Sequence, residues 1–307
     1  MKRARAICFP LALLSFLVSQ PVAVDAAKIL WPKPLTAFQG DLVEVKVGGE
    51  DLVGVDGLLG KERVYFRSSE NGFYTALMGV DVEARPATVK LILKATTAGG
   101  DQRQSEIPLK IRAKTFHQES FKVPPSFDEM SPETLAEIRR EQAAFAAAFA
   151  STAAERYWSL PFLRPVAQEA SASSFGSRRI INGVPRAPHT GTDLSAPAGT
   201  EVVATNHGKV VLVGNYFFAG GSVVIDHGDG LYSMYFHLSE FKVEEGAMVR
   251  RGDVLALSGG TGRVTGPHLH WGVRLNNTRV DPLVLLRKFS NPTDSLEVNK
   301  ASVKAEK

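Results

Sequence analysis

The stretch Gly266-Pro267-His268-Leu269-His270-Trp271 lies near the end of the 307-residue chain. Side chains alternate between the two faces of a β-strand, so His268 and His270 would point the same way, about 6.6 Å apart along the strand, with Leu269 pointing into a core. The bare pattern favours two interpretations about equally. One is a pair of surface histidines on an edge strand, and the other is part of a transition-metal site, with zinc as the first candidate.

Two segments upstream offer further metal ligands. His189 and Asp193 lie four residues apart in a glycine-containing segment that we expect to be a loop, and His237 ends the apolar run of a predicted strand. A catalytic zinc ion needs three protein ligands and one position for water, and it lowers the pKa of that water from about 16 to about 7. The three segments together therefore predict zinc-dependent hydrolysis.

The motifs around these histidines closely resemble the lysostaphin-like, or LytM-type, zinc endopeptidases, which cut the peptides of peptidoglycan. The matching motifs span about residues 175–286 and are FGSR (175–178), HTGTDLSAPAGTEVVA (189–204), IDHGDGLYSMYFHL (225–238), GGTGRVTGPHLHWGV (259–273) and VDP (280–282). The resemblance implies one Zn²⁺ per peptidase domain, with peptidoglycan stem peptides or their cross-links as substrate.

The resemblance also assigns roles to the five residues. It makes His189, Asp193 and His270 the metal ligands, and it places His237 and His268 beside the metal as catalytic residues. The chain has no HExxH glutamate, so an imidazole would take the proton from the attacking water or stabilise the oxyanion of the intermediate. Spacing does not distinguish the two roles between His237 and His268, and the sequence does not specify substrate-binding residues.

Residues 1–26 have the pattern of a secretory signal peptide. Basic residues at positions 2, 3 and 5 precede an apolar run over 7–18, and Val24-Asp25-Ala26 offers a small-residue cleavage site. The run is too short to span a bilayer comfortably. Together with the resemblance, this predicts an exported protein of the periplasm or cell envelope of a bacterium, which does not span the membrane after signal cleavage.

Composition limits the other possibilities. The formal net charge of +4 would fall to +2 without residues 1–26, which carry three positive charges and one negative charge, so nothing favours nucleic-acid binding. The single cysteine, Cys8, lies inside the predicted signal peptide. The mature chain would contain no disulfide and would depend on its hydrophobic cores for stability.

The remaining sequence predicts a mainly β protein of two domains joined by a helical linker. Residues 27–114 contain short alternating strands typical of an immunoglobulin-like β-sandwich; the expected strands are 42–47, 62–67, 73–80, 88–95 and 107–112. Residues 175–289 are glycine-rich and predict a LytM-type antiparallel β-sheet domain; the expected strands are 201–204, 209–213, 222–226, 233–237 and 254–258. Residues 290–307 are polar and predict a disordered tail.

Residues 115–174 predict the linker. Ser131 is a suitable N-cap, Pro132 follows at the first helical position, and apolar residues recur at helical spacing up to Phe149. We expect an amphipathic helix of about five turns. It would pack on one of the two domains, or less readily bind a partner.

Two other function classes remain open. LytM-type modules that have lost metal ligands act as adaptors that bind the wall or activate other wall hydrolases, whereas all five positions are filled here. The segments EVVATNHGKVV (201–211) and VEEGAMVRRGDVLA (243–256) are similar to barrel-sandwich carrier domains, but no turn with a suitable modifiable lysine is evident. The sequence therefore favours the enzyme. Cross-links between stem peptides are the first substrate candidate, and pentaglycine bridges are the second.

Overall fold

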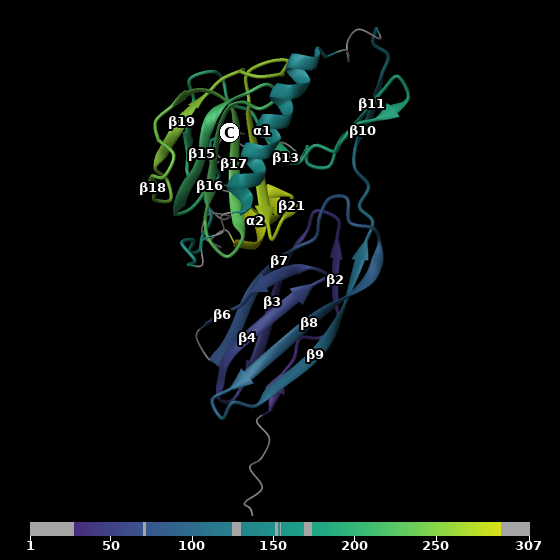
Figure 1. Ribbon diagram of the computed structural model, residues 1–307, viewed down its shortest axis with the longest axis vertical. Coiled ribbons are helices and arrows are strands. Elements are labelled where there is room, and N and C mark those ends of the chain that lie inside the picture. Colours follow the sequence, from purple (N-terminus) through teal and green to yellow (C-terminus); the bar gives the residue numbers. More distant parts are fainter. Residues whose placement is uncertain are drawn as a thin grey trace, which may run out of the picture.

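The computed structural model describes residues 28–69, 72–124, 130–150, 153, 155–168 and 174–289 (Figure 1). The predicted signal peptide and the predicted C-terminal tail lie outside these residues. Within them, no helix combines the length and apolar character needed to cross a membrane. The prediction of a mainly β protein is confirmed.

The N-terminal part is a sandwich of two sheets. One has the order β1-β3-β7-β6 and the other β2-β9-β8-β4-β5. The strands are β1 (Ile29–Leu30), β2 (Leu35–Phe38), β3 (Leu42–Gly49), β4 (Leu52–Leu59), β5 (Glu62–Tyr65), β6 (Arg67–Ser68), β7 (Phe73–Gly79), β8 (Ala87–Thr97) and β9 (Gln102–Arg112). Alternate residues of each strand face inward, as in Val43, Val45 and Val47 of β3, and together they form one apolar core.

Strand β4 is absent from the sequence prediction. Its residues include Gly54 and Gly57, which favour turns when read locally. The strand forms because it pairs with β8 on one side and β5 on the other. At Gly57 an added Cβ would lie 2.7 Å from the ring of Phe66, so this glycine permits close packing.

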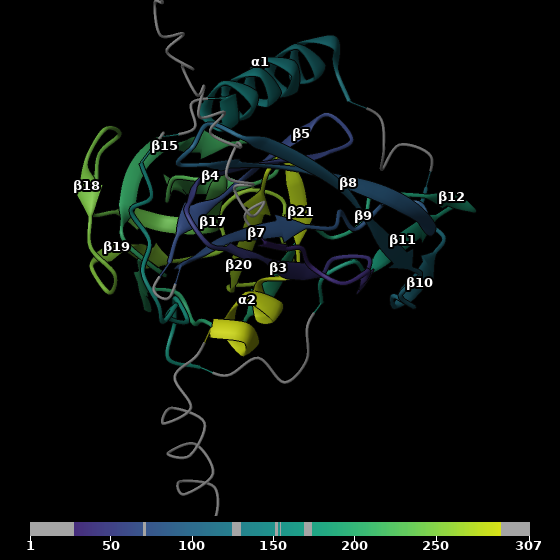
Figure 2. The same ribbon diagram turned by 90° about the horizontal axis from the view of Figure 1, so that it is seen from below.

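The segment between the two sheet regions contains one helix and a small sheet. Strand β10 (Gln118–Phe121) pairs with β11 (Arg178–Ile181), which pairs with β12 (Val184–Pro185). Helix α1 (Pro132–Ala150) confirms the predicted helix, and the Thr134 N–H donates to Ser131 Oγ at 3.2 Å as an N-cap requires. In Figure 2 the small sheet and β18 lie on opposite sides of the molecule.

The C-terminal part is built on a nine-stranded sheet. Its main path is β13-β20-β17-β16-β15-β18, with β14 and β19 paired beside it and β21 on β20. The elements are β13 (Gly191–Leu194), β14 (Glu201–Val203), β15 (Gly208–Tyr216), β16 (Gly220–Asp226), β17 (Leu231–Phe241), β18 (Met248–Val249), β19 (Val254–Ser258), β20 (Leu269–Leu275), β21 (Thr278–Val280) and helix α2 (Pro282–Phe289).

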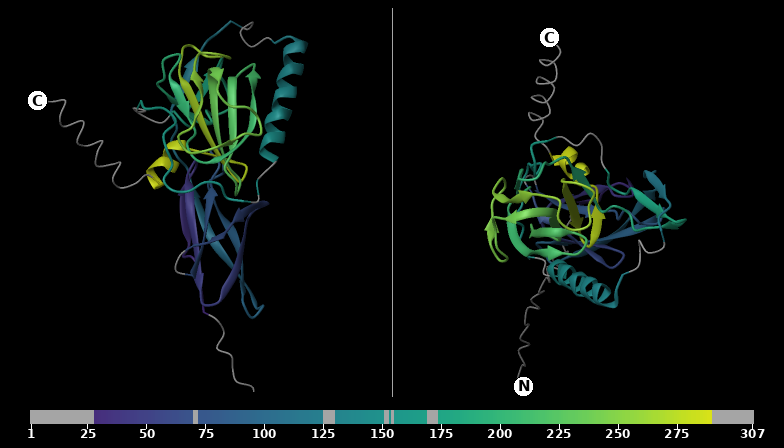
Figure 3. Two further views of the ribbon diagram at one scale, coloured as in Figure 1. Left: turned by 90° about the vertical axis from the view of Figure 1, so that its left-hand side faces the viewer. Right: turned by 90° about the horizontal axis from the view of Figure 1, so that it is seen from above.

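The two faces of this sheet differ in what covers them. One face carries the largest core, to which the fully buried cross-strand pair Tyr235 and Trp271 belongs. Helix α1 covers part of the other face through Phe145, Phe149 and Ala148 (Figure 3). Leu269 and Trp271 of β20 point into the core, so His270 between them points to this second face.

Ion pairs join the sandwich to the C-terminal sheet. Arg279 donates to Asp81 of the sandwich at 2.6 Å. Asp229, which is only 5% exposed, accepts from Arg67 of the sandwich at 2.6 Å and from Arg156 at 2.7 Å. Strand β7 also lies against β20 and β21. The two parts therefore share a polar interface as well as an apolar one.

Candidate metal centre

The centre forms where β13 lies beside β20. Asp193 and His270 are direct cross-strand partners in this antiparallel pair. The prediction of a loop is wrong for Asp193, which lies on β13. Glycine and threonine make the segment look irregular on its own, but pairing with β20 holds it extended. His189 precedes the strand, and His268 lies just before β20, where it bridges Gly259.

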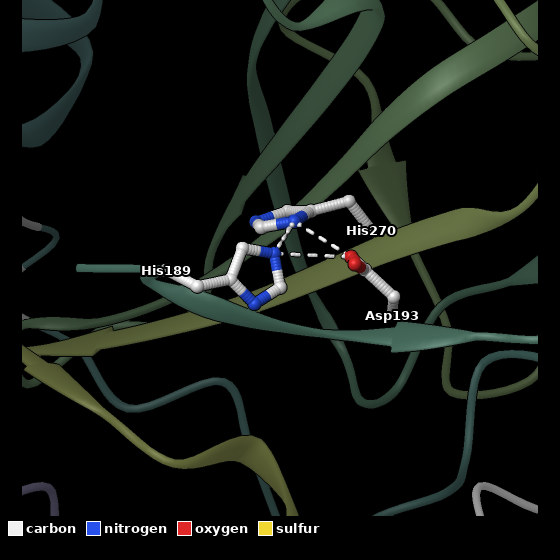
Figure 4. A group of neighbouring side chains, drawn as sticks. All are labelled: His189, Asp193 and His270. Carbon is white, nitrogen blue, oxygen red and sulfur yellow. Dashed lines mark hydrogen bonds and ion pairs between the residues drawn. The ribbon is translucent and has the colours of Figure 1, made fainter. Parts of the chain in front are cut away.

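Three side chains converge at this point (Figure 4). His189 Nε2 lies 2.8 Å from His270 Nδ1, and each of these nitrogens lies 3.1 Å from Asp193 Oδ1. Among the part of the chain that the structure describes, these residues form the one group of three or more histidine, cysteine or acidic side chains with metal-ligand spacing. Asp193 is partly exposed, so the group is reachable from solvent.

Backbone groups fix the two histidine ligand candidates. His189 Nδ1 lies 3.1 Å from the carbonyl oxygen of Ser174, and this contact holds the ring with Nε2 facing Asp193. The ring of His270 passes close above Gly191, where an added Cβ would lie 2.5 Å from His270 Nε2. Glycine at this position leaves room for the imidazole.

The other two predicted histidines lie beside this group. His268 Nε2 is 3.6 Å from Asp193 Oδ1, and the ring centroids of His237 and His268 are 4.8 Å apart. His237 Nδ1 donates to Thr261 O at 3.0 Å, and His268 Nδ1 donates to Gly266 O at 2.9 Å. Each neutral ring therefore keeps Nε2 as its acceptor. The backbone of His237 has a φ of 65°, a conformation that non-glycine residues rarely adopt and that often marks functional sites.

The charges in the centre suit a cation. Burial by itself would raise the pKa of Asp193, but hydrogen bonds with His189 and His270 outweigh it and hold the pKa well below its usual value. Burial lowers the pKa of His270, and it lowers that of His237 to about 4, with nearby His270 adding to the effect. The low pKa of Asp193 favours an ionised carboxylate and the lowered pKa of His270 favours a neutral imidazole, the protonation states in which these two groups bind metal.

The distances also fit zinc. Two ligand atoms about 2.0–2.1 Å from one zinc ion at tetrahedral angles lie about 3.3 Å apart. The observed separations of 2.8, 3.1 and 3.1 Å reach that value by outward shifts of a few tenths of an ångström. Two nitrogens and one carboxylate oxygen form a donor set typical of zinc.

The remaining histidines and Arg178 have other surroundings. His227 is fully buried, with Nδ1 2.7 Å from His207 O and Nε2 2.7 Å from Ser233 Oγ. His117 is exposed and pairs with Glu119. Arg178, the arginine of the FGSR motif, pairs with Glu83 of the sandwich at 3.0 Å.

Sequence reasoning missed one side chain that contacts the centre. Phe236 is the cross-strand partner of His270, and its ring stacks on the His270 imidazole with a centroid distance of 5.3 Å and an interplanar angle of 6°. No sequence signal marked this contact, because the sequence does not show which residues oppose each other across an antiparallel pair.

Comparison with known proteins identifies the chain's relatives. Residues 187–282 match the model of peptidase family M23. The peptidoglycan DD-endopeptidase ShyA of Vibrio cholerae serotype O1 is 48% identical over 101 residues, which are 33% of this chain and 24% of ShyA. The DD-carboxypeptidase/endopeptidase Mpg of Neisseria meningitidis serogroup B is 41% identical over 120 residues, which are 39% of this chain and 27% of Mpg. The chain thus spans about a quarter of the length of these two relatives.

The similarity to one solved structure extends over both parts of the molecule. A protein from Pseudomonas aeruginosa assigned to peptidase M23 is 31% identical, with a TM-score of 0.64, and the match covers 84% of this chain and 97% of that one. The matched length includes sequence well outside residues 187–282. Taken with the family match and the convergent histidine and aspartate side chains, this shows that the chain belongs to peptidase family M23.

Proposed function

We propose that this protein is a zinc-dependent endopeptidase that hydrolyses peptide cross-links of bacterial peptidoglycan. The observation that carries the proposal is the triangle of His189 Nε2, Asp193 Oδ1 and His270 Nδ1, whose sides measure 2.8–3.1 Å. These three residues would hold one Zn²⁺. The ion, when bound, supplies a Lewis acid and a water of lowered pKa.

His237 and His268 perform the proton transfers in this proposal. Their Nδ1–H groups donate to backbone carbonyls, so each Nε2 is free to accept the proton of the attacking water. Once protonated, the same nitrogen donates a hydrogen bond to the oxyanion or a proton to the leaving amine. The low pKa of His237 keeps its ring neutral at neutral pH, the state in which Nε2 has a lone pair for a proton.

The substrate class follows from the relatives. ShyA is named a peptidoglycan DD-endopeptidase and Mpg a DD-carboxypeptidase/endopeptidase, which supports cross-links between stem peptides. A glycyl-glycine endopeptidase, ALE-1 of Staphylococcus capitis, is 36% identical over 126 residues, and pentaglycine bridges are therefore the second substrate to test. Action on peptidoglycan places the protein in the cell envelope, and the sequence of residues 1–26 supports export to the periplasm.

The alternative is a catalytically inactive adaptor that binds the wall or activates other wall hydrolases. An adaptor does not need a complete set of ligands and adjacent bases. Here His237 and His268 lie against the three candidate ligands, and the donor atoms are correctly spaced. The complete centre favours the enzyme.

Digestion of purified peptidoglycan tests the proposal. The zinc-loaded full chain should release monomeric muropeptides from cross-linked dimers, and mass spectrometry should show a new amine and a new carboxylate at the cleaved bond. His268→Ala, prepared identically, is the control and should leave the dimers intact. A folded, zinc-loaded wild-type protein that cleaves neither stem-peptide cross-links nor pentaglycine would support the adaptor.

A further inference from the structure

Helix α1 lies outside residues 187–282, which match the family, yet it packs on the sheet face that carries the metal centre. Two of its residues, Glu141 and Phe145, are four apart and therefore project from the same side of the helix. Each begins a chain of direct contacts that ends at a different histidine of the centre.

The first chain of contacts runs through aromatic rings. Phe145 meets Phe236 edge-on, with ring centroids 5.6 Å apart and an interplanar angle of 78°. Phe236 in turn stacks face to face on His270. Phe145 also packs on Tyr216 at 4.8 Å. The ring of Phe236 thus lies between Phe145 of α1 and the candidate metal ligand His270.

The second chain of contacts runs through the turn between β15 and β16. Glu141 Oε1 accepts a hydrogen bond from the Phe217 N–H at 2.8 Å. Two residues later, Ala219 O accepts from the backbone N–H of His237 at 2.9 Å. Strand β16 begins directly after the turn, and its Gly221 N–H donates to Thr261 Oγ1 at 2.8 Å, while Thr261 O accepts from His237 Nδ1. The turn therefore contacts the backbone of His237 directly, and the strand that follows it contacts Thr261, which holds the ring.

We propose that Glu141 and Phe145 of α1 are positioning residues of the catalytic centre: Phe145 fixes the orientation of the metal ligand His270 through Phe236, and Glu141 fixes the proton-transfer residue His237 through the turn at 217–219. Neither residue touches substrate or metal. The inference rests on the proposed zinc-dependent function and extends it to a helix outside the matched family domain.

Zinc affinity tests the first chain of contacts. Phe145→Leu in the full chain should weaken zinc binding about tenfold, the lower end of the effect of removing a group that supports a metal ligand. The dissociation constant is measured by competition with a chromogenic chelator. The d–d absorption bands of the Co²⁺-substituted protein should also shift, because the direction of the imidazole ligand changes.

Phe149→Leu provides the matched control. Phe149 lies on the same helix and in the same cluster, but its ring packs on Tyr232 at 5.3 Å and on Phe145 at 6.3 Å, whereas the ring that meets Phe236 is that of Phe145. It should lose comparable packing and keep the zinc affinity and Co²⁺ spectrum of the wild type. Equal zinc affinities for wild type, Phe145→Leu and Phe149→Leu would overturn the inference while leaving the proposed function standing. A wild type that binds no zinc would overturn both.

Three further variants complete the test. If circular dichroism shows that Phe145→Leu has not folded, Phe145→Met retains most of the volume without the ring and should give the same weakening of zinc binding.

The second chain of contacts is tested by kcat. Glu141→Ala should lower kcat about tenfold with zinc affinity unchanged, a fraction of the 10²–10⁴ that general acid–base catalysis contributes. Glu141→Gln keeps the acceptor oxygen and should restore kcat. A wild-type kcat for Glu141→Ala would overturn the role of Glu141.

Discussion

At the residue scale, the centre depends on side chains whose surroundings fix both their direction and their charge. Asp193 is ionised because two imidazoles bond to it, and His189, His237 and His268 each have Nδ1 tied to a backbone carbonyl. One oriented nitrogen per ring is then left to face the centre. The result is a preorganised set of donors rather than a flexible cluster.

His227 shows how a buried histidine outside the centre makes stability depend on pH. Burial lowers its pKa to about 4 from about 6.5. Below pH 6.5 the unfolded state binds a proton that the folded state rejects, so the free energy of unfolding should fall by about 1.4 kcal/mol per pH unit until about pH 4. Other titrating groups also contribute to this pH dependence, so comparison with His227→Gln isolates the contribution of His227.

The measurement is urea unfolding of both proteins with a chelator present, between pH 7 and pH 4.5. The variant will be less stable at pH 7 because it loses hydrogen bonds to His207 O and Ser233 Oγ, but its stability should decline less steeply with acidification. Parallel curves for the two proteins would show that His227 is not the titrating group.

The sequence predicted the side chains of the centre but not the groups that orient them. The histidine-rich motifs carry His189, Asp193, His237, His268 and His270 directly. The acceptors are carbonyl oxygens of Ser174, Thr261 and Gly266, and every residue has such an oxygen. No residue type signals them, so only the folded backbone reveals them.

At the element scale, local signals predicted the elements that stabilise themselves. Helix α1 has its cap, its proline and its apolar spacing within one segment. Strands β4 and β13 have no such signal, since their glycines favour turns and only pairing with neighbours makes them strands. A local sequence pattern does not show which distant strands will pair, so it does not predict strands that depend on pairing.

The N-cap of α1 gives a prediction at this scale. Ser131→Ala removes the acceptor of the Thr134 N–H and should destabilise α1 by about 1 kcal/mol, whereas Ser131→Gly should cost only a few tenths. Amide hydrogen exchange measures this directly. Exchange in α1 should speed up about fivefold in Ser131→Ala, with strand β8 unchanged, and an equal effect of both substitutions would argue against capping by the side chain.

At the scale of the whole molecule, the ion pairs that join the sandwich to the peptidase sheet include a buried carboxylate, that of Asp229. Asp229 is 5% exposed and binds two arginines, whereas Asp56 is 66% exposed and pairs with Arg63 inside the sandwich. Buried carboxylates cost more to leave unmatched than exposed ones. The sequence did not predict this interface, because its partners lie up to 198 residues apart.

Asp229→Asn tests the interface while keeping the side-chain shape. Asparagine tolerates the positive φ of 53° at this position, so the loss is mainly one of charge. Thermal unfolding should show a loss of about 1–2 kcal/mol, discounted from the value for fully buried pairs because the arginines are partly exposed. Asp56→Asn is the control and should leave the melting temperature unchanged. Equal melting temperatures for both variants would contradict a contribution from the interface.

The most direct test of the central claim is the zinc content of the purified chain and its variants, determined by elemental analysis alongside the cleavage of cross-linked muropeptides. The wild type should hold one zinc ion per chain, and His189→Ala, Asp193→Ala and His270→Ala should lose both zinc and activity. His237→Ala and His268→Ala should keep the zinc and lose turnover by about 10²–10⁴. A wild type that stays free of zinc with the metal in excess, or a His270→Ala variant that keeps its zinc, would contradict the account.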